Sequence, residues 1–311
     1  MTSILLTVSI VDPFNGKCLY FDIFVTLFLI YTLLYTQLRQ TKLIKFTVID
    51  ENLYLKRFLD PIKVCRRYKP KFGLGNREEG LDLATFLSLY GSDPFYSWIG
   101  LNSDLMYAAH KAAGGMTSIY RQIGRGCESL FRQIIIDQAN YDDPKDVLWS
   151  YTVQTKNNKE KRLSLDARLE LTAIQNYDVR ERVTQWIANY SQSLNVPAPA
   201  NGAVFEVRQG YKSKDSKRQN ADIDNIAVAW ANGYLPVFAI FSSQIDSDLV
   251  LRYRNSRGAI ITGTLLGTSQ NSLFVFSKNV LGYDLADFLQ RNSSLIRDEV
   301  YTTLEVLLTA K

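Results

Sequence analysis

The spacing of hydrophobic residues along this 311-residue chain predicts both helices and strands. Over Met116–Ile134, apolar side chains recur at three- and four-residue steps, which is typical of a helix with one buried face. Arg162–Ile174 instead alternates between apolar and polar residues, so we predict a strand with one buried and one charged face. Asp178–Leu194 and Ser294–Leu308 again show helical spacing.

The carboxy-terminal half continues with strands and helices in alternation. A strand is predicted from Gly202 to Tyr211, and the nearly uninterrupted apolar run Leu235–Ser243 is typical of a central strand. Two further apolar runs, Ala259–Gly267 and Ser272–Lys278, indicate a hairpin. Helices are expected at Asp222–Tyr234 and Ile245–Ser256. This order predicts an α/β (α+β) fold, with a helical amino-terminal part before a mixed sheet.

The amino terminus is set apart by an uncharged apolar stretch, Ile23–Leu38. We therefore expect three regions: an apolar segment (1–47), a mostly helical region (48–145) and an α/β core (146–311). A membrane-spanning helix needs about 20 apolar residues, so Ile23–Leu38 is borderline. It is a membrane anchor, an apolar helix packed on the body, or sequence translated upstream of the true start. Because the rest of the chain has the composition of a soluble protein, we do not expect a membrane partner.

The scarce residue types exclude several classes of chemistry. The chain has one histidine, His110, and three widely spaced cysteines, so neither a structural zinc site nor a disulfide scaffold is expected. This cysteine usage favours a reducing cytoplasm. Catalytic triads need a histidine base, and nucleotide-binding loops need glycine motifs that are missing here. Any catalysis therefore depends on carboxylates, Lys or Arg, and a carboxylate-bound metal. The net charge of +5 favours a polyanionic partner.

The polar face of the Met116–Ile134 helix is a candidate phosphate-binding surface. At helical spacing it carries Arg121, Arg125, Glu128 and Arg132. Such an arginine stripe either contacts phosphates or is simply a solvated face. Gly124 and Gly126 each cost about 1 kcal/mol relative to alanine within a helix. Close approach of another backbone would explain both glycines.

The most informative segment for chemistry is the strand that contains Glu206 and Arg208. Residues two apart on a strand share a face, so this carboxylate and this cation project together. A phosphodiesterase can be built from such a pair, with the carboxylate holding Mg²⁺ and the cation stabilising the charged transition state. A second acid is needed, and the charged face of the preceding strand offers Asp166 or Glu170. The alternative is that Glu206 and Arg208 form an ordinary ion pair on a sheet face.

Cations gather around the same strand end, which favours a phosphate-bearing partner. These residues are Arg208, Lys212, Lys214, Lys217, Arg218 and, further along the chain, Arg252. Contacts between such side chains and nucleic-acid phosphates add up, and they weaken as salt concentration rises.

Three long segments, Phe205–Ile223, Tyr234–Asp248 and Val280–Phe288, resemble the ApaLI-like type II restriction endonucleases, and Met116–Ile134 is similar to the same family. The resemblance covers roughly Lys71 to the carboxy terminus. It implies a PD-(D/E)XK-type core and a homodimer that cuts double-stranded DNA at a short palindromic site using Mg²⁺. It further implies that an acid on one strand (Asp166 or Glu170) and Glu206 on the next bind the metal. A cognate DNA methyltransferase is then expected as a functional partner.

The sequence departs from that core where lysine is expected two residues after the acid. Arg208 stands there, and arginine cannot act as a general base at neutral pH. Lys212 is an alternative for the lysine role. Side chains that could read bases are Arg252, Arg254, Arg257 and the three arginines of the stripe. The competing hypotheses are a non-catalytic DNA-binding protein, an inactivated endonuclease and a membrane-anchored protein.

Overall fold

The computed structural model describes residues 7–11, 18–22, 49–71, 80–154, 160–210 and 216–309. By its internal contacts the chain divides into Met1–Val48 and Ile49–Lys311, so the expected boundary near residue 145 falls within the second unit. The first unit contains an antiparallel pair, β1 (Thr7–Val11) and β2 (Cys18–Asp22). The apolar stretch 23–38 lies outside the described residues. Within the described ranges, no helix is both long and apolar enough to cross a membrane.

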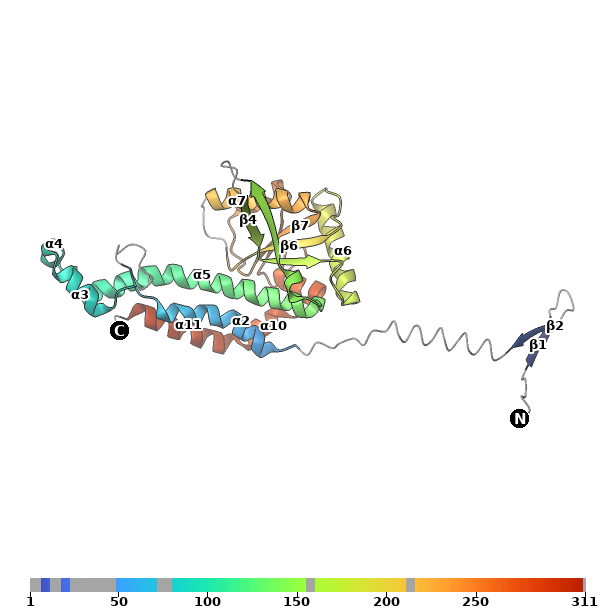
Figure 1. Ribbon diagram of the computed structural model, residues 1–311, viewed down its shortest axis with the longest axis horizontal. Helices are drawn as coiled ribbons and strands as arrows, with labels where there is room; N and C mark the ends of the chain where they lie inside the picture. Colours follow the sequence, from blue (N-terminus) through green and yellow to red (C-terminus); the bar gives the residue numbers. More distant parts are fainter. Residues whose placement is uncertain are drawn as a thin grey trace, which may run out of the picture. The chain divides into compact units, whose positions relative to one another are not determined.

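The second unit is organised along one long helix, α5 (Asp104–Ala139). The Ser103 side chain caps its first turn by accepting a hydrogen bond from the Met106 N–H, and Asn140 ends it in the left-handed conformation. Figure 1 shows α2 (Glu51–Lys63) and α11 (Ser293–Leu308) running alongside α5. Shorter helical elements are η1 (Val64–Arg67), α3 (Leu83–Gly91), α4 (Pro94–Trp98), η2 (Pro144–Val147) and α10 (Leu285–Arg291).

A four-stranded mixed sheet packs on α5. Its order is β5-β6-β7-β8, with β5 antiparallel to β6 and with β6, β7 and β8 mutually parallel. Its strands are β5 (Ala167–Glu170), β6 (Gly202–Arg208), β7 (Tyr234–Ile240) and β8 (Ala259–Thr262). The connecting helices are α6 (Tyr177–Ser193), α7 (Ser216–Ala231) and α8 (Ser247–Asn255). The predicted mixed α/β class is confirmed, and every residue of β7 is buried, as expected of a central strand.

The two faces of the sheet belong to different clusters of buried side chains. On one face, Phe205 and Val207 of β6 join the main core with residues of α5 and α6. On the other face, Phe238 and Ile240 of β7 pack with apolar residues of α7 and α8. Because side chains alternate along β6, Glu206 projects to the face that α7 and α8 cover. Figure 1 shows β6 and β7 between α7 and α5.

The segment predicted as one strand over 162–174 is in fact two strands that meet at Asp166. β4 (Glu160–Leu165) pairs with β3 (Trp149–Gln154) in an antiparallel hairpin, whereas β5 pairs with β6. The predicted alternation of burial is preserved, with Leu165, Ala167 and Leu169 buried. The break at Asp166 is invisible in the pattern because the alternation keeps its period while the hydrogen-bonding partner changes.

The predicted hairpin after α8 was wrong in its second half. Ala259–Thr262 forms β8, but Leu273–Phe276 is helix α9, continued by a π-helical turn at Ser277–Leu281. The Ser272 hydroxyl caps this helix by accepting a hydrogen bond from the Val275 N–H at 3.1 Å. A short apolar run that is buried on all sides has no period that separates a strand from a helix.

The apolar face of α5 was predicted correctly in its second half and less well in its first. Ile119, Cys127 and Phe131 are buried, whereas Met116 and Tyr120 are exposed. At this end of α5 the covered face carries Tyr107, Lys111 and Gly115, and Gly115 packs against Leu307 of α11, so Met116 and Tyr120 lie outside the covered face. Gly126 is approached by the backbone of α2, as predicted for both helix glycines. Gly124 has no neighbour within 4 Å, so that half of the prediction was wrong.

Candidate active site

Asp166 and Glu206 lie next to each other where β5 begins and β6 ends. The β5–β6 register pairs Ala167 with Phe205, and the Asp166 N–H donates to the Phe205 carbonyl at 2.9 Å. Asp166 Oδ2 accepts a hydrogen bond from the Val207 N–H at 2.8 Å, which fixes this carboxylate beside β6. The long insertion of α6 between the two strands therefore does not prevent their direct pairing.

Glu170 lies at the other end of the same strand pair. It is paired with Gly202, at the start of β6, and its carboxylate accepts a hydrogen bond from the Tyr234 hydroxyl at 2.5 Å. Glu206 follows Gly202 by four positions along β6, or about 13 Å along a strand. The structure thus places Asp166 next to Glu206 and Glu170 at the far end of the strand pair.

Arg208 is held between two carboxylates. Its Nη2 lies 2.6 Å from Glu206 Oε1 and 3.0 Å from Asp222 Oδ1. The second oxygen of Asp222 accepts a hydrogen bond from the Tyr253 hydroxyl at 2.6 Å. The Arg208 and Glu206 side chains are 11% and 16% exposed, and that of Asp222 is 3% exposed. The ion pair predicted as the alternative interpretation of Glu206 and Arg208 therefore exists, and a third residue joins it.

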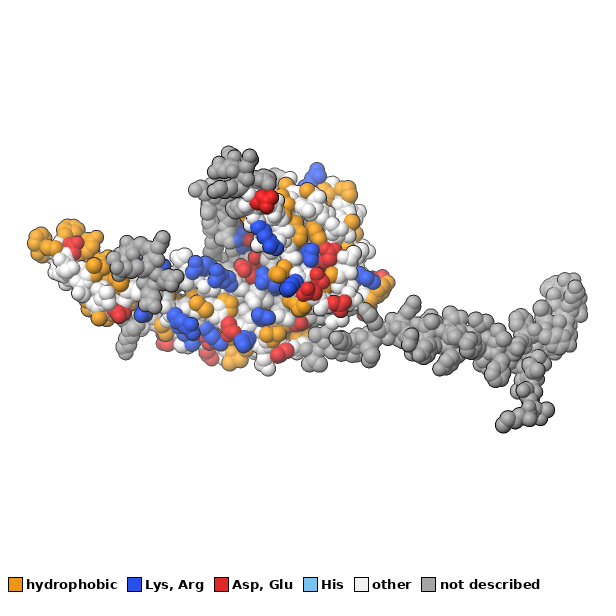
Figure 2. Space-filling model, viewed as in Figure 1, with side chains coloured by type: hydrophobic (Ala, Val, Ile, Leu, Met, Phe, Trp, Pro, Cys, Tyr) orange, Lys and Arg blue, Asp and Glu red, His pale blue; other side chains and the backbone are white. Residues whose placement is uncertain are grey.

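The helix α5 contributes two further polar side chains to this site. Arg132 Nε donates to the Asp166 carbonyl at 2.9 Å, and Glu128, one turn earlier, lies close enough for its charge to act on Glu206. Arg121 and Arg125, earlier in the predicted stripe, are exposed. The stripe therefore leads from solvent into the site, and Figure 2 shows Lys/Arg and Asp/Glu side chains intermixed on the face in view.

Burial and mutual repulsion make these carboxyl groups reluctant to ionise. Burial, followed by the negative charge of Asp166, raises the pKa of Glu206 to about 8. Burial also raises the pKa of Asp166, against the hydrogen bond from Val207 and the charge of Arg208. For Glu128, burial and the charge of Asp166 raise the pKa to about 7. Neighbouring carboxyl groups with raised pKa values are typical of functional sites and of sites where a bound cation balances the negative charge.

The residues present fit a Mg²⁺ ion only if waters and substrate phosphates complete its coordination shell. Among the described residues, no group of three or more Asp, Glu, His or Cys side chains is arranged to hold a metal. Mg²⁺ is usually held by one or two carboxylates with waters and substrate phosphates. Asp166 and Glu206 are two such carboxylates. The donor set is compatible with a metal that substrate helps to bind, and not with a closed protein cage.

The predicted basic loop is only partly described. Lys212 and Lys214 lie outside the described residues, so the hypothesis that Lys212 fills the lysine role stays a prediction. Lys217 and Arg218 belong to the first turn of α7, and their side chains are likewise outside the described part.

Three of the arginines proposed to read bases lie on α8 or just after it, in different positions. Arg252 donates to Gln219 Oε1 and Asn220 Oδ1, both at 2.6 Å, in the first turns of α7. Arg254 lies in the last turn of α8, and Arg257 lies two residues beyond its end, just before β8 begins. Because β8 runs parallel to β6, Arg257 is at the opposite edge of the sheet from Glu206. The structure therefore does not bring Arg254 and Arg257 to the Asp166–Glu206 pair.

Sequence reasoning missed Asp222 and Tyr253 and treated Glu128 only as part of a charged helix face. One signal existed for Asp222, because it occupies a buried position on the apolar side of a predicted helix. A buried carboxylate needs a partner, so an acid at such a position predicts an ion pair. The identity of that partner depends on which strand the helix covers, and no local pattern contains this information.

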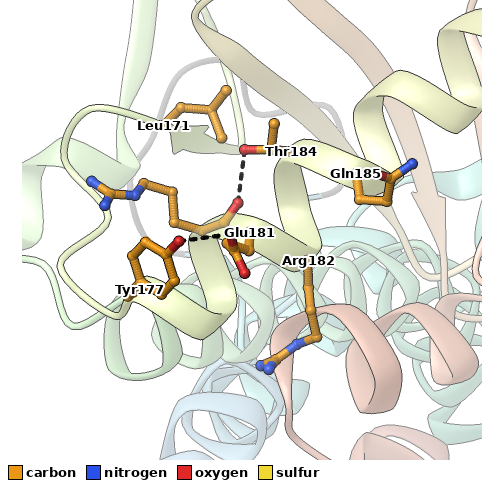
Figure 3. A pocket seen from close by; sticks show the side chains of 7 residues that line it. Leu171, Tyr177, Glu181, Arg182, Thr184 and Gln185 are labelled. Carbon is orange, nitrogen blue, oxygen red and sulfur yellow. Dashed lines mark hydrogen bonds between the residues drawn. The ribbon is translucent and has the colours of Figure 1, made fainter. Parts of the chain in front are cut away.

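A separate hollow of about 590 Å³ lies at the surface of α6 and does not contain the candidate site. In Figure 3, Tyr177 donates a hydrogen bond to Glu181 at 2.7 Å, and the Thr184 hydroxyl donates to the Arg180 carbonyl at 2.8 Å. Its walls are one exposed helix surface and Leu171. The Arg182 and Gln185 side chains of this hollow likewise donate, to the Val280 carbonyl at 3.0 Å and to Asn189 Oδ1 at 2.8 Å, so its polar groups are already bonded within the protein.

Comparison of the chain with protein-family models, with curated proteins and with solved structures gives no match.

Proposed function

We propose that this protein is a type II restriction endonuclease, a Mg²⁺-dependent phosphodiester hydrolase that cuts double-stranded DNA at a short palindromic site. The observation that carries the proposal is the pairing of Asp166 with Glu206 and Arg208 at the adjoining ends of two antiparallel strands. A PD-(D/E)XK-type core has an acid on one strand and an acid-x-cation motif on the next. The resemblance noted in the sequence predicts this arrangement, and the geometry supports it.

The proposed chemistry assigns a separate task to each of three residues. Asp166 and Glu206 would hold Mg²⁺, which supplies a polarised phosphate and an activated water. Arg208 stays protonated at neutral pH, so it would stabilise negative charge on the phosphate and could not act as a base. With only His110 in the chain, carboxylates and cations are the groups available for this work.

Double-stranded DNA is the substrate that this charge distribution favours. Arg121 and Arg125 are exposed on the helix that leads to Glu128, and the basic segment 212–218 follows directly after β6. DNA phosphates would contact such cations, and each contact adds to affinity. A palindromic site further implies a homodimer, and an active enzyme in the cytoplasm implies a cognate methyltransferase that protects host DNA.

One observation favours a second candidate, a DNA-binding protein without catalytic activity, which includes an inactivated endonuclease. The guanidinium of Arg208 lies 2.6 Å from Glu206 Oε1 and could take the place of a metal. In that case the site would bind DNA and never cut it.

Digestion of phage and plasmid DNA by the purified full-length protein tests these proposals. One set of reactions contains Mg²⁺, a second contains EDTA, and a third contains the Glu206→Ala variant with Mg²⁺. We expect discrete bands only in the first set. DNA that is retarded on a gel but uncut in all three sets would favour the non-catalytic candidate. A folded protein that neither cuts nor retards DNA would refute both.

A further inference from the structure

The side chain of Arg208 contacts two acids, although it carries one charge. Glu206 and Asp222 both lie within 3.0 Å of the same Nη2 atom. One guanidinium can balance only one carboxylate, so one negative charge is left over. Which carboxylate carries it depends on which acid is held more firmly by Arg208. That remaining negative charge is what a divalent cation would encounter at the strand ends.

Asp222 is the more firmly held and the more deeply buried of the two acids. Its side chain is 3% exposed against 16% for Glu206. The Tyr253 hydroxyl fixes its second oxygen, and the Tyr253 ring is itself buried and stacked on Phe238 with centroids 4.3 Å apart. A carboxylate in such surroundings is strongly destabilised without a counter-charge, whereas Glu206 keeps access to solvent.

We propose that Asp222, fixed by Tyr253, is a positioning residue that takes up the charge of Arg208 and leaves the Glu206 carboxylate available to a divalent cation. This inference rests on the proposed metal-dependent function. It also explains how the site tolerates arginine where lysine is expected. Arginine is always charged, so without Asp222 its guanidinium would neutralise the Glu206 ligand permanently.

Binding of Mn²⁺ alone to the full-length protein, without DNA, provides a direct readout by calorimetry. Asp222→Asn keeps the side-chain shape but removes one negative charge, so Arg208 would then pair with Glu206 alone. We expect Mn²⁺ affinity to fall by roughly tenfold, because metal affinity follows the charge of the site. In the double variant Arg208→Met/Asp222→Asn both charges are gone. We expect its affinity to return to within about threefold of the wild type, a non-additivity that reports direct coupling.

Two tyrosine variants separate this role from a purely structural one. Tyr253→Phe removes the hydroxyl that bonds Asp222. Tyr190→Phe removes another buried hydroxyl, which donates to the Ile260 carbonyl at 3.1 Å and accepts from the Ile260 N–H at 2.9 Å. Both should lower the unfolding temperature, and Tyr190→Phe at least as much as Tyr253→Phe, because it loses two hydrogen bonds. Only Tyr253→Phe should weaken Mn²⁺ binding, by about threefold to tenfold, the value of one lost hydrogen bond.

The outcomes distinguish this inference from the proposed function. A folded Asp222→Asn protein that binds Mn²⁺ as tightly as the wild type, or a double variant as weak as the single one, would overturn the role of Asp222 and leave the nuclease proposal intact. A wild-type protein that does not bind Mn²⁺ without DNA would overturn the inference alone, because the proposed nuclease can take up its metal together with substrate; the DNA digestion then tests the nuclease proposal separately. If Asp222→Asn does not fold, equal Mn²⁺ affinities of the two tyrosine variants would be enough to reject the inference.

Discussion

The two glycines within α5 allow a sharp test of how closely α2 and α5 approach. A Cβ built on Gly126 would lie 2.4 Å from the Phe58 carbonyl oxygen of α2, whereas one built on Gly124 has no neighbour within 4 Å. Ordinary contacts begin at 3.4 Å, so Gly126→Ala requires α2 to move away by about 1 Å, the difference between 3.4 and 2.4. The contact is with backbone, which cannot rotate out of the way as a side chain can.

The two substitutions should have opposite effects on the free energy of unfolding. Alanine in a helix interior is more favourable than glycine by about 1 kcal/mol, so Gly124→Ala should stabilise the protein by about that amount. Gly126→Ala gains the same propensity but overpacks the contact with α2, which costs about 1–3 kcal/mol, and should destabilise by up to about 2 kcal/mol. The difference between the variants is therefore about 1–3 kcal/mol, or roughly 2–10 °C in Tm.

Thermal and urea unfolding of both variants, with circular dichroism at 222 nm as the signal, measures this difference. Because the two sites lie two residues apart on one helix, local propensity cancels and the contact with Phe58 remains. If Gly126→Ala stabilised the protein as much as Gly124→Ala, the close packing of α2 on α5 would be refuted.

Three further predictions concern the site. Asp166→Asn should reduce DNA cleavage at least about 100-fold, and Glu170→Gln less than about threefold, since only Asp166 lies beside Glu206. Equal losses would contradict the proposed role of Asp166 as the acid that acts with Glu206. Because burial raises the pKa of Glu206 to about 8, from 4.5, the folded metal-free protein binds a proton that the unfolded chain releases. Its stability should therefore fall as pH rises from about 4.5 to 8, and melting curves in EDTA should show a shallower fall for Glu206→Gln. Arg121→Ala and Arg125→Ala should each weaken DNA binding and reduce the slope of log affinity against log salt by about 1, as fluorescence anisotropy can measure; an unchanged slope would remove α5 from the DNA path.

Hydrophobic periodicity in the sequence was sufficient to predict a helix or strand where the surroundings of that element stay the same along its length. The helices α6 and α11 and the strands β6 and β7 lie near their predicted positions, because each helix buries one face and each of these central strands is covered on both faces. The same alternation by itself places Glu206 and Arg208 on one face of β6. Local spacing is enough for such statements because backbone geometry alone fixes which side chains share a face.

Only the tertiary structure decided how the site is completed. The break at Asp166, the position of Asp166 rather than Glu170 beside Glu206, and the joining of Asp222 to Arg208 all depend on residues far apart in the chain. A strand can exchange its hydrogen-bonding partner without altering its own period, and a helix can bury an acid against any strand that carries a cation. The sequence determines which groups are available and which face they occupy, whereas pairing between distant segments determines which of them meet.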